Sequence, residues 1–162
     1  IGVRTNEKGS VEDMKKLRIS LAMRVASEHL SYRSLIEEIE GDLELYRKAE
    51  TTSTAALSRL LQSFQSQVQT HFALEEKGGL FEVYREHGPA FRRQAATMLA
   101  QHQDFLARLR RILEIVSTVQ RPDSPEFERC ARELGDLFRA LRAHERVEDA
   151  LLERLVEQDM GR

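Results

Sequence analysis

The stretch TAALSRLLQSFQSQVQTHFALEEK, residues 54–77, decides how this chain folds. Its apolar residues recur every three or four positions, which is the spacing of one face of an α-helix. The same face carries His71 and Glu75, which are four residues apart and therefore point the same way. The predicted inward residues of this helix are Leu57, Leu60, Leu61, Phe64, Val68, His71 and Glu75. The stretch is therefore predicted to be a long helix that turns one histidine and one carboxylate inward.

Three further segments, at about 11–48, 90–119 and 124–158, show the same periodicity. Ser10 is a predicted N-cap of the first, and Asp123 or Ser124 of the last. Gly78-Gly79 predicts a kink or break in the second helix, with 80–85 as a further turn or two, and Gly88-Pro89 predicts its end. The predicted inward residues of the first helix are Leu17, Leu21, Val25, His29, Tyr32, Ile36, Ile39, Leu43 and Tyr46. Those of the third are Phe91, Ala95, Met98, Leu99, His102, Phe105, Leu109, Ile112, Leu113 and Val116. Those of the fourth are Leu134, Leu137, Leu141, His144, Glu148, Leu151, Leu152 and Leu155.

The links between these helices are short, so neighbouring helices are expected to run antiparallel. The predicted fold is all-α, an antiparallel up-and-down four-helix bundle over residues 11–160, preceded by a flexible segment at 1–10. The chain of 162 residues is long enough for one domain with its own core.

Composition excludes several classes of function. With 25 basic and 27 acidic residues, the chain lacks the basic excess of a nucleic-acid surface. No apolar run approaches the roughly 18 residues that span a bilayer, so no membrane partner is expected. Cys130 is the only cysteine, which fits a reducing compartment, and the polar start does not resemble a signal peptide. A cytoplasmic location is therefore expected.

Each predicted inward stripe contains one histidine close to the midpoint of its helix. In an up-and-down bundle these midpoints lie at about the same height, so the four imidazoles are expected to meet in one buried layer. Glu75 and Glu148 follow two of the histidines at helical spacing and join the layer. One buried histidine is most often a hydrogen-bonded core residue, but four neutral imidazoles with two carboxylates cannot satisfy one another without a cation. The predicted ligands of a two-metal site are His29, His71, Glu75, His102, His144 and Glu148.

The segments HFALEEKGGLF (71–81) and HERVEDALL (144–152) resemble motifs of the hemerythrin-like, or HHE cation-binding, family. His29 and LAQH (99–102) resemble its ligand regions in the first and third helices. The resemblance implies two iron ions with an oxo or hydroxo bridge, manganese or zinc being alternatives that the ligand types also allow. It implies that His29 and His71 bind one iron and that His102 and His144 bind the other. Glu75 and Glu148 would bridge the two.

The chain departs from oxygen-carrying members of the family in two places. The carriers have HxxxH in the third helix, whereas Met98 and Leu106 lie four residues from His102. The carriers use HxxxxD in the last helix, which matches Asp149; a regular helix instead turns Glu148 toward the same point as His144. Without a fifth histidine the site has an additional open coordination position. The candidate groups to fill it are Glu76, Tyr32 and Gln101.

These features favour a metal-binding protein used for oxygen, redox or iron sensing or binding, with a small ligand such as dioxygen. An enzyme that acts on oxygen, peroxide or nitric oxide is the alternative, and whether the chain is an enzyme at all stays open. A metal-free helical interaction module or a histidine phosphotransfer module is a third reading, and phosphotransfer would need an exposed histidine. Long helices can pair between copies, so a homodimer is a candidate assembly.

Overall fold

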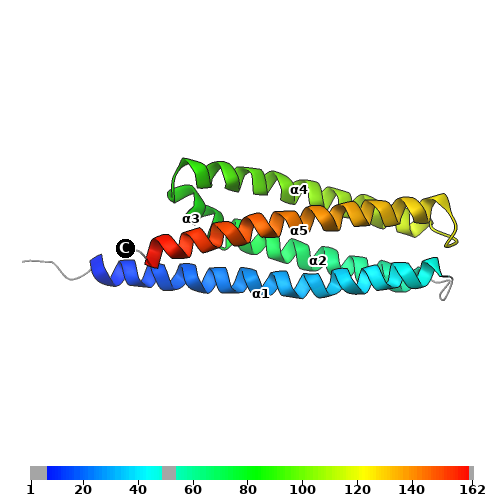
Figure 1. The fold of residues 1–162 in the computed structure, drawn as a ribbon, viewed down its shortest axis with the longest axis horizontal. Coiled ribbons are helices and arrows are strands. Elements are labelled where there is room, and N and C mark those ends of the chain that lie inside the picture. Colours follow the sequence, from blue (N-terminus) through cyan, green and yellow to red (C-terminus); the bar gives the residue numbers. More distant parts are fainter. Residues whose placement is uncertain (1–6, 49–53, 161–162) are drawn as a thin grey trace, which may run out of the picture.

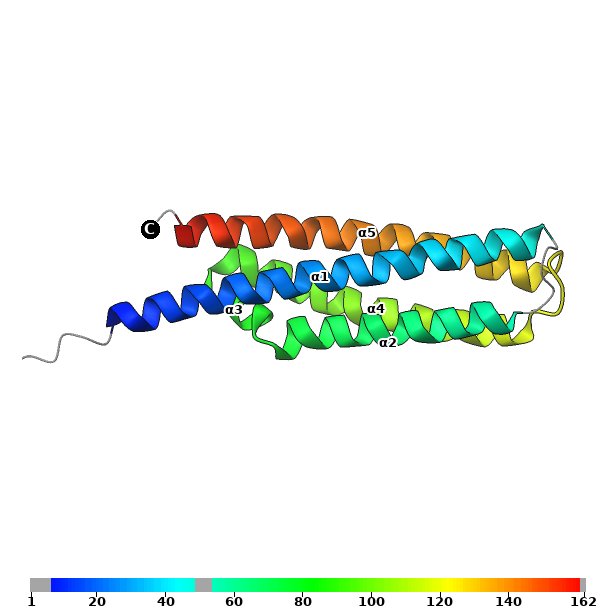
Figure 2. The same cartoon turned by 90° about the horizontal axis from the view of Figure 1, so that it is seen from below.

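The structure is a computed structural model, and it describes residues 7–48 and 54–160. It contains four long helices, α1 (Glu7–Arg47), α2 (Ala55–Lys77), α4 (Pro89–Thr118) and α5 (Pro125–Met160). The long helices alternate in direction along the bundle (Figure 1). Helices α1 and α4 each pack against both α2 and α5 (Figure 2). The described ranges contain no strand, and the predicted all-α, up-and-down four-helix bundle is confirmed.

A short helix, α3 (Leu80–Glu86), lies between α2 and α4, so the predicted break at the glycine pair is present. Gly79 precedes α3 with a φ of 99°, and Gly88 precedes α4 with a φ of 116°. Both values favour glycine, because a Cβ is strained there. At the far end of the bundle, Ser124 caps α5 by accepting a hydrogen bond of 3.1 Å from the Phe127 backbone N–H. Of the two predicted caps, Ser124 is therefore the one used.

Three predictions about the helices were wrong in detail. Helix α1 begins at Glu7, so Ser10 lies inside it and does not cap it. The polar first turns carry no apolar periodicity that would have marked this start. Of the segment predicted to be flexible, residues 1–6 lie outside the described ranges. Leu17 and Leu99, predicted to face inward, are 61% and 37% exposed. Leu99 lies one position, or about 100°, from buried Met98 on the seam of α4.

The buried apolar residues form two clusters, one toward each end of the bundle. One cluster includes Ile36, Phe64 and Leu134, and the other includes Val25 and Leu155. Nearly all buried polar side chains of the described residues lie in the layer between these clusters. In the described part of the chain, no helix combines the length and apolar character needed to cross a bilayer. The bundle therefore surrounds one polar layer with apolar packing on both sides.

Candidate metal centre

Four long helices each contribute one histidine to the polar layer. His29 comes from α1, His71 from α2, His102 from α4 and His144 from α5, and each is at most 2% exposed. The two carboxylates that follow at i+4, Glu75 and Glu148, are 0% exposed. The structure thus brings together all six residues that the sequence singles out.

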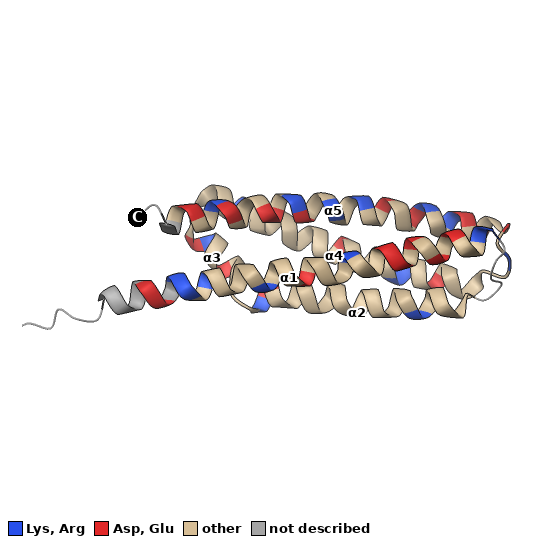
Figure 3. Cartoon of the chain, turned by 60° about the horizontal axis from the view of Figure 1, so that its bottom comes forward, with Lys and Arg blue, Asp and Glu red and all other residues tan. Residues whose placement is uncertain are grey.

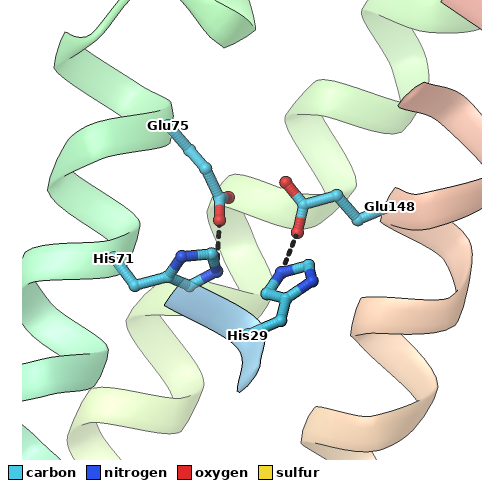
Figure 4. Close-up of side chains that lie close together, drawn as sticks. All are labelled: His29, His71, Glu75 and Glu148. Carbon is cyan, nitrogen blue, oxygen red and sulfur yellow. Dashed lines mark hydrogen bonds and ion pairs between the residues drawn. The ribbon is translucent and has the colours of Figure 1, made fainter. Parts of the chain in front are cut away.

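One half of the layer contains two histidines and both glutamates (Figure 4). His29 Nε2 lies 3.2 Å from Glu148 Oε2, and His71 Nε2 lies 2.5 Å from Glu75 Oε1. The four side chains present donor atoms that all lie within 4.8 Å of one another. A single cation placed among them would have two nitrogen and two oxygen donors.

The other half contains His102, His144 and again Glu75. His102 Nε2 lies 3.1 Å from His144 Nε2 and 3.2 Å from Glu75 Oε2. Glu75 therefore turns one carboxylate oxygen toward each half of the layer. Glu148 belongs to the first half only, so the structure distinguishes the two glutamates that the family resemblance treats as equivalent bridges.

The histidines of the second half are held by their outer ring nitrogens. His102 Nδ1–H donates to Glu76 Oε1 and His144 Nδ1–H donates to Gln101 Oε1, both at 2.8 Å. A neutral imidazole has only one N–H, so each inner Nε2 then presents a lone pair. Two lone pairs facing each other at 3.1 Å repel unless a proton or a cation lies between them. Outer contacts of this kind orient the histidines of metal sites.

Several inner atoms lack the hydrogen bonds that buried polar atoms normally have. Neither oxygen of Glu75 accepts a hydrogen bond, and neither ring nitrogen of His71 takes part in one. The 2.5 Å approach of His71 to Glu75 satisfies the distance but not the direction of a hydrogen bond. Glu148 Oε1 is unpartnered as well. Leaving so many buried donors and acceptors unpaired is costly, and a bound cation would satisfy them. The residues present therefore fit a metal.

The pKa values of His71 and His144 favour the neutral form that metal binding requires. Burial lowers the pKa of His71 to about 4, and burial together with the neighbouring histidines lowers that of His144 to about 3. Both imidazoles are therefore neutral near pH 7. Burial, together with the neighbouring Glu148 carboxylate, raises the pKa of Glu75 to about 8, although contacts with His102 oppose the shift. Burial alone would lower the pKa of His29, but Glu148, Glu145 and Asp149 outweigh it and the net shift is upward.

Helix geometry separates the roles of Glu148 and Asp149. Glu148 points into the layer, as the i+4 register predicts, whereas the Asp149 side chain is 44% exposed. Asp149 Oδ1 lies 3.3 Å from the outer nitrogen, Nδ1, of His29. Glu76 and Gln101, both candidates for an additional ligand, likewise contact outer nitrogens and not the interior of the layer. Tyr32 is buried beside His71, with the ring centroids 5.3 Å apart, and its hydroxyl has no hydrogen-bond partner.

Two features of the site are absent from the sequence prediction. Glu145 is 1% exposed and accepts a 2.6 Å hydrogen bond from Arg33 Nε. No local pattern signals this contact, because the two residues are 112 positions apart. Phe72 stacks on His102 with ring centroids 3.7 Å apart, and Phe105 meets His144 edge-on at 5.5 Å. In the sequence, Phe72 is marked only by its position next to His71. In the structure it lies on the side of α2 that faces α4.

Two other candidate residues lie away from the layer. His87 follows α3, where its Nδ1 is 2.8 Å from the Val83 carbonyl oxygen, and it belongs to neither donor group. Cys130 is buried among apolar side chains, and burial raises the pKa of its thiol to about 12. A thiol with so high a pKa is a poor metal ligand.

Comparison with known proteins agrees with the geometry. A family model described as "Hemerythrin HHE cation binding domain" matches residues 23–156, which include all six inner residues. No curated protein and no solved structure matches the chain significantly.

Proposed function

The chain belongs to the hemerythrin HHE cation-binding domain family, and from this premise we propose that its buried layer holds two iron ions. His29, His71 and Glu148 would hold one ion, and His102 and His144 the other. Glu75 would be shared, because it turns one oxygen toward each histidine pair. Mixed imidazole and carboxylate ligands with open positions are typical of iron sites that react with small molecules, with manganese and zinc as alternatives. When bound, such a pair of ions supplies redox chemistry and a place for an oxo or hydroxo bridge.

One observation carries this proposal. Glu75 is 0% exposed between two histidine pairs, and neither of its oxygens accepts a hydrogen bond. A carboxylate buried in this way is expected to have a cation on each side. Metal analysis of the freshly purified protein, together with its visible spectrum, tests the proposal. About two irons per chain and near-ultraviolet oxo-to-iron bands are expected, and a protein that binds no transition metal would refute it.

We further propose that this centre binds or senses a small ligand such as dioxygen, or responds to redox state or iron supply. The third-helix position that would hold a further histidine is apolar, with Met98 and Leu106 on either side of His102 in sequence. The centre would therefore have an additional open position, which suits sensing better than clean reversible carriage. Oxygen titration of the reduced protein tests this step. Complete reversal of oxygen binding over many cycles would contradict it.

Tyr32 favours a second candidate function, that of an enzyme acting on oxygen, peroxide or nitric oxide. Its hydroxyl is buried next to His29 and His71, close to the Glu145 carboxylate, and makes no hydrogen bond of adequate geometry with the described residues. Burial raises the pKa of this phenol, so it stays protonated and can donate a hydrogen bond to a bound molecule. Multiple turnovers of peroxide that fall in Tyr32→Phe, at unchanged iron content, would favour the enzyme. Stoichiometric binding without turnover would favour the sensor.

A metal-free phosphotransfer module receives no support from the geometry. Phosphotransfer requires an accessible imidazole, whereas all four histidines of the layer are at most 2% exposed.

A further inference from the structure

A groove runs along the surface between the first half of α1 and the last part of α5. Its volume is about 590 Å³. The small side chains of Ala22 and Ala26 on α1 leave room for it, and Leu152 is part of its apolar lining. Asp149 and Glu153, followed by Glu157, line its α5 side.

The three carboxylates form a ladder along one side of α5. They are spaced four residues apart, which on a helix separates successive members by about 6 Å. Acidic positions recur along this part of α5, opposite α1 (Figure 3). Glu153 and Glu157 are exposed, and neither forms an ion pair with another described residue. The groove lining contains no lysine or arginine. The groove is therefore a negatively charged surface whose two outer carboxylates are uncommitted, whereas the inner one, Asp149, lies 3.7 Å from the Arg33 guanidinium.

The inner end of the ladder meets the candidate metal centre. Asp149 Oδ1 lies 3.3 Å from Nδ1 of His29, a residue that is only 1% exposed. This buried Nδ1 has no hydrogen bond of adequate direction, although it faces the groove-lining carboxylate. The opposite nitrogen of the same ring, Nε2, faces Glu148 at 3.2 Å. A single imidazole thus separates the groove from the inner donor atoms.

We propose that this groove is the route by which divalent cations reach the buried centre. The inference rests on the proposed function, because it presupposes that the layer binds metal. A cleft lined by one sign of charge raises the local concentration of counter-ions and their rate of association. Asp149 passes the cation to the His29 side of the layer, and the outer glutamates collect it from solution. Glu153 and Glu157 are thus residues for uptake and not ligands of the final site.

Kinetics of iron uptake test this route directly. Metal-free protein is mixed with Fe²⁺ under anaerobic conditions, and protein-bound iron is measured at fixed times after removal of free metal. The variant is Glu153→Gln/Glu157→Gln, and the matched control is Glu37→Gln/Glu38→Gln, an equal change of charge at exposed positions of α1 away from the groove. We expect initial uptake about tenfold slower in the groove variant at low ionic strength, with a smaller difference at high salt. Final iron content should equal that of the wild type.

Each other outcome overturns the inference in a recognisable way. Equal slowing in the groove and control variants would mean that net charge alone matters. Unchanged uptake would mean that cations enter elsewhere. A lower final iron content in the groove variant would make the glutamates ligands. If the wild type itself takes up no iron, the proposed function fails and the route falls with it.

A steric variant provides an independent measurement. Ala26→Trp fills the groove without changing charge, and Ala96→Trp places the same residue on an exposed position of α4. We expect slower uptake only in Ala26→Trp, with helical content and final iron content as checks on folding. Equal rates in the two tryptophan variants would also overturn the route.

Discussion

Replacing Glu75 by glutamine should have opposite effects on stability in the metal-free and metal-loaded protein. Glu75 is 0% exposed, and its oxygens accept no hydrogen bond. In the metal-free protein, burial and the nearby Glu148 carboxylate disfavour the ionised form of Glu75 and raise its pKa to about 8. Glutamine has nearly the same shape and cannot ionise. Glu75→Gln therefore removes the cost of keeping this group protonated at neutral pH, without opening a cavity.

The size of the effect follows from the pKa difference. The pKa of this carboxyl group is 4.5 in the unfolded chain and about 8 in the folded protein, so the folded state binds more protons between these pH values. The free energy of unfolding therefore falls as the pH rises from 4.5 to about 8. Each pKa unit corresponds to about 1.4 kcal/mol, and at pH 7 the unfolded chain gains about 3 kcal/mol from ionising this group. Glu75→Gln loses this dependence. The buried amide retains a desolvation cost of its own, so the informative quantity is how the difference between variant and wild type changes with pH.

Bound metal should reverse the order of stability. A ligand that binds only the folded state stabilises it, and the wild type has the shared carboxylate that glutamine replaces. Iron-loaded wild type should therefore be more stable than Glu75→Gln, and the variant should retain well below two irons per chain.

Urea unfolding at pH 5, 6, 7 and 8, with chelator-treated and iron-loaded samples, measures both effects. Glu37→Gln, at an exposed position on α1, is the control and should behave like the wild type in each condition. Relative to the wild type, the metal-free variant should become more stable by about 2.5 kcal/mol between pH 5 and pH 7. A difference that is constant across this range, or equal stabilisation of both proteins by iron, would refute the reasoning.

Three further outcomes are expected. His144→Ala, which removes a donor that is 2% exposed, should bind clearly less than two irons per chain by elemental analysis, and full occupancy would exclude His144 as a ligand. Gln101→Ala removes the acceptor 2.8 Å from His144 Nδ1 and should weaken metal affinity about 10–100-fold in a chelator competition, with two irons still bound at saturation. Phe72→Ala should cost about 3–5 kcal/mol in urea unfolding, because Phe72 is 2% exposed and stacks on His102, whereas Leu30→Ala at a 66% exposed position should cost little.

The inner donor set could be predicted from the sequence because it depends on local periodicity. The i+4 spacing of His71 and Glu75 fixes their common direction on one helix, and the midpoint positions of the histidines bring the helices into register. The error of one residue at Leu99 arose because an apolar side chain lies next to the seam and not on it. The prediction succeeded where several turns repeated the same signal.

The outer contacts could not be predicted, because they join distant parts of the chain. Glu145 is held by Arg33 from another helix, and His102 is oriented by Glu76 from α2. Glu76, Gln101 and Asp149 all carry oxygen donors, so residue type alone could not separate a metal ligand from a group that orients one. Only the side-chain directions in the folded bundle separate these roles.

The unequal surroundings of the two histidine pairs bear on which half of the proposed centre has room for a small ligand. His29 and His71 share two carboxylates, and beside His29 lies the polar network of Asp149 and Arg33. The second pair has one carboxylate and lies among the rings of Phe72, Phe81 and Phe105. Fewer protein donors leave more coordination positions open, and aromatic walls exclude water and disfavour charged molecules. The second half therefore suits a small neutral molecule such as dioxygen, whereas the first half, next to the acidic groove, suits the arrival of cations.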